Sequence, residues 1–179
     1  MGNVITIFGS SRPLPDSEEY QTAFVAGRSL ARRGFTVCNG AYGGTMEAAS
    51  KGAREAGGST IGVTSAAFSR TPNSWVEKEI RTETMVERLL KLVELGKGYV
   101  VLKGGTGTLL ELAAVWEFIN KGFQPRKPIV VVGTFWNAVI ETMRSEQIWE
   151  GSGDCAEYIT HVQTPEACAE HLFQALGAG

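Results

Sequence analysis

The chain of 179 residues has few of the side chains that bind metals or form disulfides. Its three cysteines, Cys38, Cys155 and Cys168, are widely spaced and form no Cys-x-x-Cys pair, and there are only two histidines. An odd number of scattered thiols does not suggest a disulfide framework, and the spacing does not match a zinc site. We therefore expect a reduced protein with no metal and no cofactor.

Long apolar runs and an excess of positive charge are also missing. No apolar stretch approaches the length of a membrane-spanning helix, and the N-terminus has no basic region ahead of an apolar signal segment. The formal net charge is -2, without the basic stripe that is typical of nucleic-acid-binding domains. The expected protein is cytoplasmic, contacts neither membranes nor nucleic acid, and binds a small molecule.

Short β-like runs alternate with helix-forming segments along the whole chain. Strands are expected at 4–8, 35–38, 60–64, 98–102, 128–133 and 158–162, with a less regular stretch at 76–82. Helices are expected at 16–33, at 45–56, at 84–95, from the glycine-rich turn to Asn120, from near Trp136 onward, and after Thr164-Pro165. Asp16 is the expected cap of the first, with Glu19 completing a capping box, and Thr84 and Glu87 form a second capping box. This alternation predicts one Rossmann-like α/β domain over residues 1–179, with a doubly wound, mainly parallel sheet and helices on both faces.

The most informative stretch is the glycine-rich segment that follows the run 98–102. Gly104, Gly105, Thr106, Gly107 and Thr108 stand between an expected strand and an expected helix. Such a turn presents backbone N–H groups and the positive end of a helix dipole to an anion, usually a phosphate. The sequence therefore predicts a phosphate-binding turn here.

Glu111 lies one helical turn beyond the glycines, in a site otherwise suited to anions. It is either a catalytic carboxylate or the partner of Thr108 in a capping box, which would make it purely structural. Both interpretations fit the spacing.

Two further turns are expected at the same edge of the sheet, because the carboxyl ends of parallel strands lie together. One is Gly9-Ser10-Ser11 and the other spans 40–45, including Gly44 and Thr45. Glu47 in the first turn of the following helix is expected to stabilise that helix through its dipole and to have no catalytic role. Arg88, one turn after Met85, is either a solvated arginine on an amphipathic helix or a guanidinium that binds a ligand in a bidentate manner.

These motifs occur in an order that resembles the Lonely Guy family of cytokinin-activating phosphoribohydrolases, often mislabelled as lysine decarboxylases. The matching segments are Gly9-Ser10-Ser11, Gly43-Gly44-Thr45-Met46, Met85-x-x-Arg88 and Gly104-Gly105-Thr106-Gly107-Thr108-x-x-Glu111. The family usually has Pro at position 103 and Glu at position 110, where this chain has Lys103 and Leu110. The turn 39–49 is more similar to a sister branch that includes a carrier of the molybdenum cofactor.

The resemblance implies a homodimer that hydrolyses the N-glycosidic bond of a nucleoside 5'-monophosphate to a free base and ribose 5-phosphate. It maps the family's arginine and glutamate onto Arg88 and Glu111. The turn residues and Met85 are expected to bind the phosphate and the rest of the nucleotide. The alternative is a carrier that binds a nucleotide or a pterin phosphate without turnover. Lysine decarboxylation is not expected, because nothing in the sequence suggests a pyridoxal site.

Overall fold

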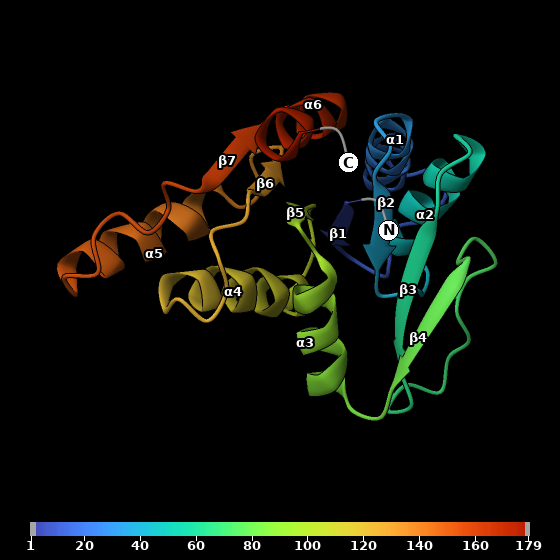
Figure 1. Ribbon diagram of the computed structural model, residues 1–179, viewed down its shortest axis with the longest axis horizontal. Coiled ribbons are helices and arrows are strands. Elements are labelled where there is room, and N and C mark those ends of the chain that lie inside the picture. The colour runs from blue at the N-terminus through green and yellow to red at the C-terminus, as the bar shows by residue number, and fades with distance from the viewer. Residues whose placement is uncertain (1–2, 178–179) are drawn as a thin grey trace.

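The computed structural model describes residues 3–177, in which seven strands and six helices alternate along the chain (Figure 1). The strands are β1 (Val4–Phe8), β2 (Thr36–Asn39), β3 (Thr60–Ser65), β4 (Lys78–Thr82), β5 (Gly98–Val101), β6 (Ile129–Val132) and β7 (Ile159–Val162). The helices are α1 (Glu18–Arg32), α2 (Thr45–Glu55), α3 (Met85–Leu95), α4 (Thr106–Asn120), α5 (Asn137–Trp149) and α6 (Pro165–Leu176). Every expected element is present, with small shifts at its ends.

All seven strands pair in parallel in one sheet, in the order β4-β3-β2-β1-β5-β6-β7. The chain winds outward from β1 to β4, and then returns to place β5 on the other side of β1. The expected Rossmann-like, doubly wound fold is confirmed. In such sheets ligands bind outside the carboxyl ends of the strands where the order reverses, which here is the crevice between β1 and β5.

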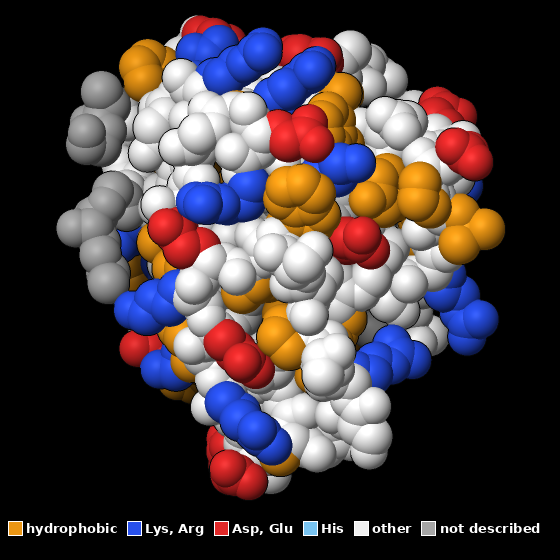
Figure 2. All heavy atoms as spheres, turned by 90° about the vertical axis from the view of Figure 1, so that its right-hand side faces the viewer, with side chains coloured by type: hydrophobic (Ala, Val, Ile, Leu, Met, Phe, Trp, Pro, Cys, Tyr) orange, Lys and Arg blue, Asp and Glu red, His pale blue; other side chains and the backbone are white. Residues whose placement is uncertain are grey.

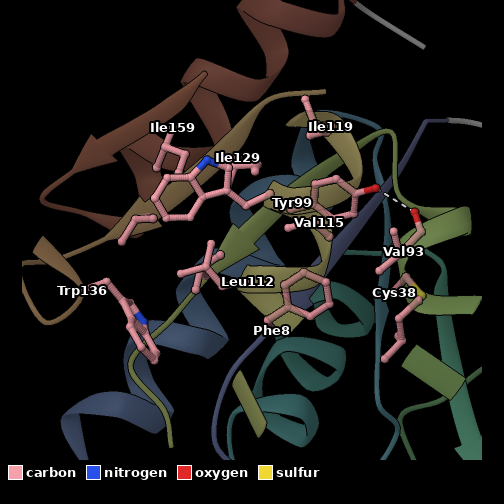
Figure 3. Close-up of a cluster of buried hydrophobic side chains, with 14 of the residues drawn as sticks. Phe8, Cys38, Val93, Tyr99, Leu112, Val115, Ile119, Ile129, Trp136 and Ile159 are labelled. Carbon is pink, nitrogen blue, oxygen red and sulfur yellow. Dashed lines mark hydrogen bonds between the residues drawn. The ribbon is translucent and has the colours of Figure 1, made fainter. Parts of the chain in front are cut away.

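Helices cover both faces of the sheet, because successive strand residues point to opposite sides. On one face, Val100 of β5 and the strands beside it pack against α1, α2 and α6. On the other face, Tyr99 and Val101 pack with Phe8 against α3, α4 and α5. Figure 3 shows this second cluster, in which Tyr99 stacks on Phe8 with ring centroids 5.8 Å apart and its hydroxyl donates to the Val93 carbonyl oxygen at 2.7 Å.

The helix starts agree with the expected caps except in α1. Thr84 and Glu87 form the expected capping box, and Thr164 caps α6 with Pro165 in its first turn. The expected Asp16 cap of α1 is wrong: Ser17 is the cap, and its side chain accepts from the Tyr20 N–H. A hydroxyl and a carboxylate are nearly equivalent caps, so adjacent candidates are not distinguished by sequence.

The edge strand β4 explains the charged stretch at 76–82. Lys78, Glu79 and Arg81 on this strand are exposed to solvent. Figure 2 views the molecule from the side on which β4 lies, and positive and negative side chains are interspersed over that face. Charges on an edge strand disfavour pairing with the edge of another sheet.

Among residues 3–177, no helix has the length and apolar character needed to cross a lipid bilayer.

Candidate functional site

A cavity of about 360 Å³ opens at the carboxyl edge of the sheet, next to the crevice between β1 and β5. Segments that are far apart in the sequence form its walls, because the parallel sheet brings the ends of its strands to one edge. Ten of the residues predicted for the site line this cavity: Gly9, Ser10, Ser11, Met85, Arg88, Gly105, Thr106, Gly107, Thr108 and Glu111.

The N-terminus of α4 forms one wall of the cavity. The helix begins at Thr106 with Gly105 as its cap, and no side chain of the described residues caps it. The first backbone N–H groups of a helix have no partner within the helix, so those of Gly105 to Thr108 are available to a ligand. A Cβ atom added at Gly105 or at Gly107 would meet no atom of residues 3–177 within 4 Å, so an anion can approach the backbone closely.

Three of the predicted binding residues, Gly44, Thr45 and Gly104, do not line this cavity. They pack the turns together instead. The backbone N–H and the hydroxyl of Thr45 both donate to the carbonyl oxygen of Ser10, at 2.9 Å each. Gly44 has a φ of 68° and passes against the backbone of Ser10, where a side chain would clash. A Cβ atom at Gly104 would meet the side chain of Thr108. These residues therefore stabilise the turns that form the cavity without facing the cavity themselves.

Arg88 is buried, with 11% of its side chain exposed, so the interpretation of a solvated arginine is wrong. Its Nε donates to the Val63 carbonyl oxygen at 2.8 Å, and an Nη donates to the Gly40 carbonyl oxygen at 2.9 Å. Only glycine fits at position 40, because a Cβ atom there would overlap the guanidinium. The backbone bonds use Nε and one Nη atom, and the other Nη atom lies beside Glu111. Arg88 is therefore fixed as a positive charge in the wall of the cavity.

Aromatic rings enclose the same guanidinium. The Cζ atom of Arg88 lies 5.4 Å from the ring centroid of Tyr42 and 5.8 Å from that of Phe68. Cation–π contacts of this kind stabilise a guanidinium that has left water. Burial lowers the pKa of Arg88, while the charge of Glu111 acts in the opposite direction.

Glu111 lies beside Arg88, with Oε1 4.0 Å from an Nη atom and 16% of its side chain exposed. The capping-box interpretation is wrong, because α4 begins at Thr106 and Glu111 is therefore beyond its first turn. Within residues 3–177 its carboxylate accepts no hydrogen bond. Burial raises the pKa of Glu111 to about 7, although the charge of Arg88 lowers it. A buried carboxylate that exchanges a proton near neutral pH is typical of acid–base catalysis.

The sequence analysis missed several residues that line the cavity. Tyr42 comes from the turn after β2 and Met46 from the first turn of α2. Phe68 and Arg70 come from the loop after β3, and Leu89 and Leu110 from α3 and α4. The loop was expected but its side chains were not assigned to the site, because nothing in their local pattern distinguishes them from other loop residues. Arg12 also lines the cavity, whereas Lys103 forms an ion pair with Glu19 at 2.7 Å outside it.

No cluster of three or more His, Cys, Asp or Glu side chains within the described part of the chain could hold a metal ion. Glu111 is the carboxylate that lines the cavity, beside the guanidinium of Arg88 and the open N-terminus of α4. This arrangement can bind an anion and move a proton with the chain's own groups.

Comparison with known proteins agrees with this geometry. A cytokinin riboside 5'-monophosphate phosphoribohydrolase of Mycobacterium marinum is 35% identical over 124 residues, which is 64% of this chain and 63% of that protein. The molybdenum cofactor carrier protein of Chlamydomonas reinhardtii superposes with a TM-score of 0.78 at 21% identity, over 98% of this chain and 99% of its own. The molybdenum cofactor binding protein of Rippkaea orientalis gives a TM-score of 0.77 at 22% identity, over 98% of both chains.

The alignment with the mycobacterial enzyme spans less than two thirds of that relative, and the two solved structures show similarity of fold. The mycobacterial relative confirms the resemblance to the Lonely Guy family, and the two solved structures have the same fold as this chain. The profile of the SLOG cluster4 family matches residues 3–168, which is nearly the whole chain. The chain therefore belongs to the SLOG cluster4 family.

Proposed function

We propose that this protein hydrolyses the N-glycosidic bond of a nucleoside 5'-monophosphate, releasing a free base and ribose 5-phosphate. The observation that supports this most is the buried pair of Arg88 and Glu111, 4.0 Å apart, in the same cavity as the open N-terminus of α4. A site that only binds a phosphate gains nothing from a buried carboxylate next to it, because the two repel each other. A catalytic site does gain from it, because the carboxylate can accept a proton or oppose a developing positive charge.

The phosphate of the substrate binds at the N-terminus of α4. The N–H groups of Gly105 to Thr108 donate to it, and the positive end of the helix dipole favours its charge. Ser10, Ser11 and Arg12, from the loop after β1, lie on the neighbouring wall and contribute hydroxyl groups and a positive charge. This binding fixes the ribose next to Glu111.

Glu111 provides the proton transfer. In its ionised form it takes a proton from a water molecule as the water oxygen attacks C1' of the ribose. The C1'–N bond breaks with its electron pair going to the base nitrogen, and the proton taken by Glu111 passes through solvent to that nitrogen, which regenerates the carboxylate. The carboxylate also opposes the positive charge that develops on the ribose, as in other glycosyl cleavages. Arg88 keeps Glu111 partly ionised near neutral pH, because its charge lowers the pKa that burial raises. In this mechanism the same positive charge polarises the departing base.

Incubation with a panel of nucleoside 5'-monophosphates is expected to release free base and ribose 5-phosphate, detected by chromatography. The corresponding nucleosides should bind far more weakly, because they lack the charge that the N-terminus of α4 binds. Calorimetric titration of adenosine and its monophosphate measures this difference. Equal affinity for the two would contradict the assignment of the phosphate site.

A carrier of a nucleotide or a pterin phosphate is the second candidate. It is supported by the two solved structures named for molybdenum cofactor binding, which match this chain over 98% of its length. A carrier requires the same phosphate site but no turnover. Absence of base release from every monophosphate tested, with binding retained, would favour this function over hydrolysis.

We also propose a homodimer formed through α3 and α4. Val86 and Leu90 lie one turn apart on α3 and are 61% and 45% exposed, and Leu109 and Leu110 are exposed on α4, which packs against α3. Light scattering at micromolar concentration should give the mass of a dimer. The double variant Val86→Glu, Leu90→Glu should be a monomer, because a dimer would have to bury the new carboxylates in its interface. Trp149→Glu on α5, which is 81% exposed, is the control and should stay dimeric.

A further inference from the structure

The cavity has an apolar side that neither phosphate binding nor proton transfer uses. Phe68, Met85, Leu89 and Leu110 line it, and Tyr42, which also lines the cavity, contacts Phe68 edge-to-face with ring centroids 5.8 Å apart. Phe68 is only partly buried. A partly exposed ring among apolar side chains at one end of the cavity offers a flat apolar surface to a ligand.

The strand order places this ring opposite the phosphate site. The N-terminus of α4 follows β5, whereas Phe68 follows β3, and β1 and β2 lie between them. Three strand spacings, on the order of 14 Å, separate the ends of β3 and β5 from which these two segments extend into the cavity. Arg88 bonds to Gly40 after β2 and to Val63 in β3, and so lies with Glu111 between the two ends. An extended ligand can thus have an anion at one end, a reacting bond in the middle and an apolar ring at the other.

The loop that bears Phe68 is held in place by hydrogen bonds to the turn after β2. The Phe68 N–H donates to the Ser65 carbonyl oxygen at 3.1 Å, and the Ser65 N–H donates to the Tyr42 hydroxyl at 3.1 Å. The side chain of Asn73 donates to the carbonyl oxygens of Ala41 and Tyr42, at 2.8 and 2.9 Å. A ring that is positioned before binding loses little conformational freedom when a ligand arrives.

We propose that Phe68 stacks on the base of the bound nucleotide and that the site selects purines by ring area; this rests on the proposed nucleotide-binding function. Apolar side chains dominate this end of the cavity, with Arg70 at its edge. Stacking discriminates weakly between bases of equal size, because every base has a π face. AMP and GMP should therefore bind with affinities within about tenfold of each other, and CMP, with its smaller ring, should bind more weakly than both.

The test compares a ligand that has a base with one that lacks it. Calorimetric titrations use AMP and ribose 5-phosphate, with the full chain carrying Glu111→Gln so that AMP is not consumed. Phe68→Ala should weaken AMP binding by a factor of about 10 to 100, the usual range for loss of one base–aromatic stack. Ribose 5-phosphate binding should be unchanged. Phe68→Leu keeps apolar volume without a ring, so its affinity for AMP should lie between those of the protein with Phe68 and of Phe68→Ala. Phe123→Ala, at a ring 76% exposed outside the cavity, is the control and should not change AMP binding.

Two results would overturn the base-stacking role of Phe68. One is an AMP affinity that Phe68→Ala leaves unchanged. The other is an equal loss for AMP and ribose 5-phosphate, which would mean that Phe68 acts by holding Arg88. Tighter binding of CMP than of AMP would overturn the preference for purines. If AMP binding depends on Phe68 but no base is released by the unsubstituted protein, only hydrolysis fails. If no monophosphate binds at all, both proposals fail.

Discussion

Replacing Glu111 by glutamine is expected to lower the rate of base release by a factor of about 100 or more while nucleotide binding stays close to that of the unsubstituted protein. Glutamine keeps the size of the side chain but can neither accept a proton from water nor oppose a developing cation. Binding should be preserved because the proposed phosphate contacts are those of the backbone of α4, and Glu111 accepts no hydrogen bond within the described residues that the change would break. Single-turnover measurements with saturating AMP separate the two effects.

The folded protein should tolerate this substitution well. The uncharged amide removes the cost of burying the carboxylate of Glu111 but also removes the counter-charge of Arg88. Arg88 keeps its bonds to Val63 and Gly40, so the unfolding free energy should fall less than in Arg88→Met. Glu117→Gln is the matched control: it lies on the same helix, is 51% exposed, and should change neither rate nor stability. Unchanged base release by Glu111→Gln would disprove the mechanism even if hydrolysis itself were established.

Replacing Arg88 by methionine is expected to cost about 3–5 kcal/mol of unfolding free energy above neutral pH, as when one member of a buried ion pair is removed. Methionine fills similar apolar space, but the carbonyl oxygens of Val63 and Gly40 lose their donors and Glu111 loses its counter-charge. Urea unfolding measures the loss. Arg144→Met, which removes an exposed arginine bound to Asp154, is the control and should have little effect.

The pH dependence of this loss identifies its cause. Glu111 has a pKa of about 7 in the folded chain against an ordinary value of 4.5, so the folded state holds the proton more tightly than the unfolded state. Its contribution to stability therefore falls as pH rises from 4.5 to about 7, and is constant above that. Without Arg88, the pKa of Glu111 rises further, and the fall should continue above pH 7. A further Glu111→Gln substitution should abolish this dependence, and its persistence would contradict the assignment to Glu111.

Much of the fold is determined by patterns that lie within short segments. Apolar runs such as 4–8 and 128–133 are nearly continuous because both faces of a parallel sheet are covered, and their alternation with amphipathic segments leads directly to the crossover topology. The capping box at Thr84 and the threonine–proline start of α6 are equally local. The cap of α1 was misplaced by one residue because neighbouring side chains were equivalent candidates.

The candidate site could be predicted where its chemistry is also local. Gly105, Thr106, Gly107 and Thr108 form the helix start that the strand–glycine–helix pattern indicated, and Glu111 follows one turn later. The role of Arg88 could not be derived in this way. Its spacing on α3 fits a solvated face. In the structure its guanidinium instead donates to carbonyl oxygens of β3 and of the turn after β2, which lie 25 and 48 residues away in the sequence.

The sequence by itself determined the order of strands and helices, the glycine-rich helix start and the carboxylate beside it, because each depends on residues within a few positions of one another. The tertiary structure alone decided that Arg88 pairs with Glu111, that Gly44 and Thr45 brace the site from behind, and that Phe68 faces the cavity. The reason is physical: these properties depend on which strand ends become neighbours at the sheet edge, and burial then decides which side chains remain charged, bonded or open to a ligand.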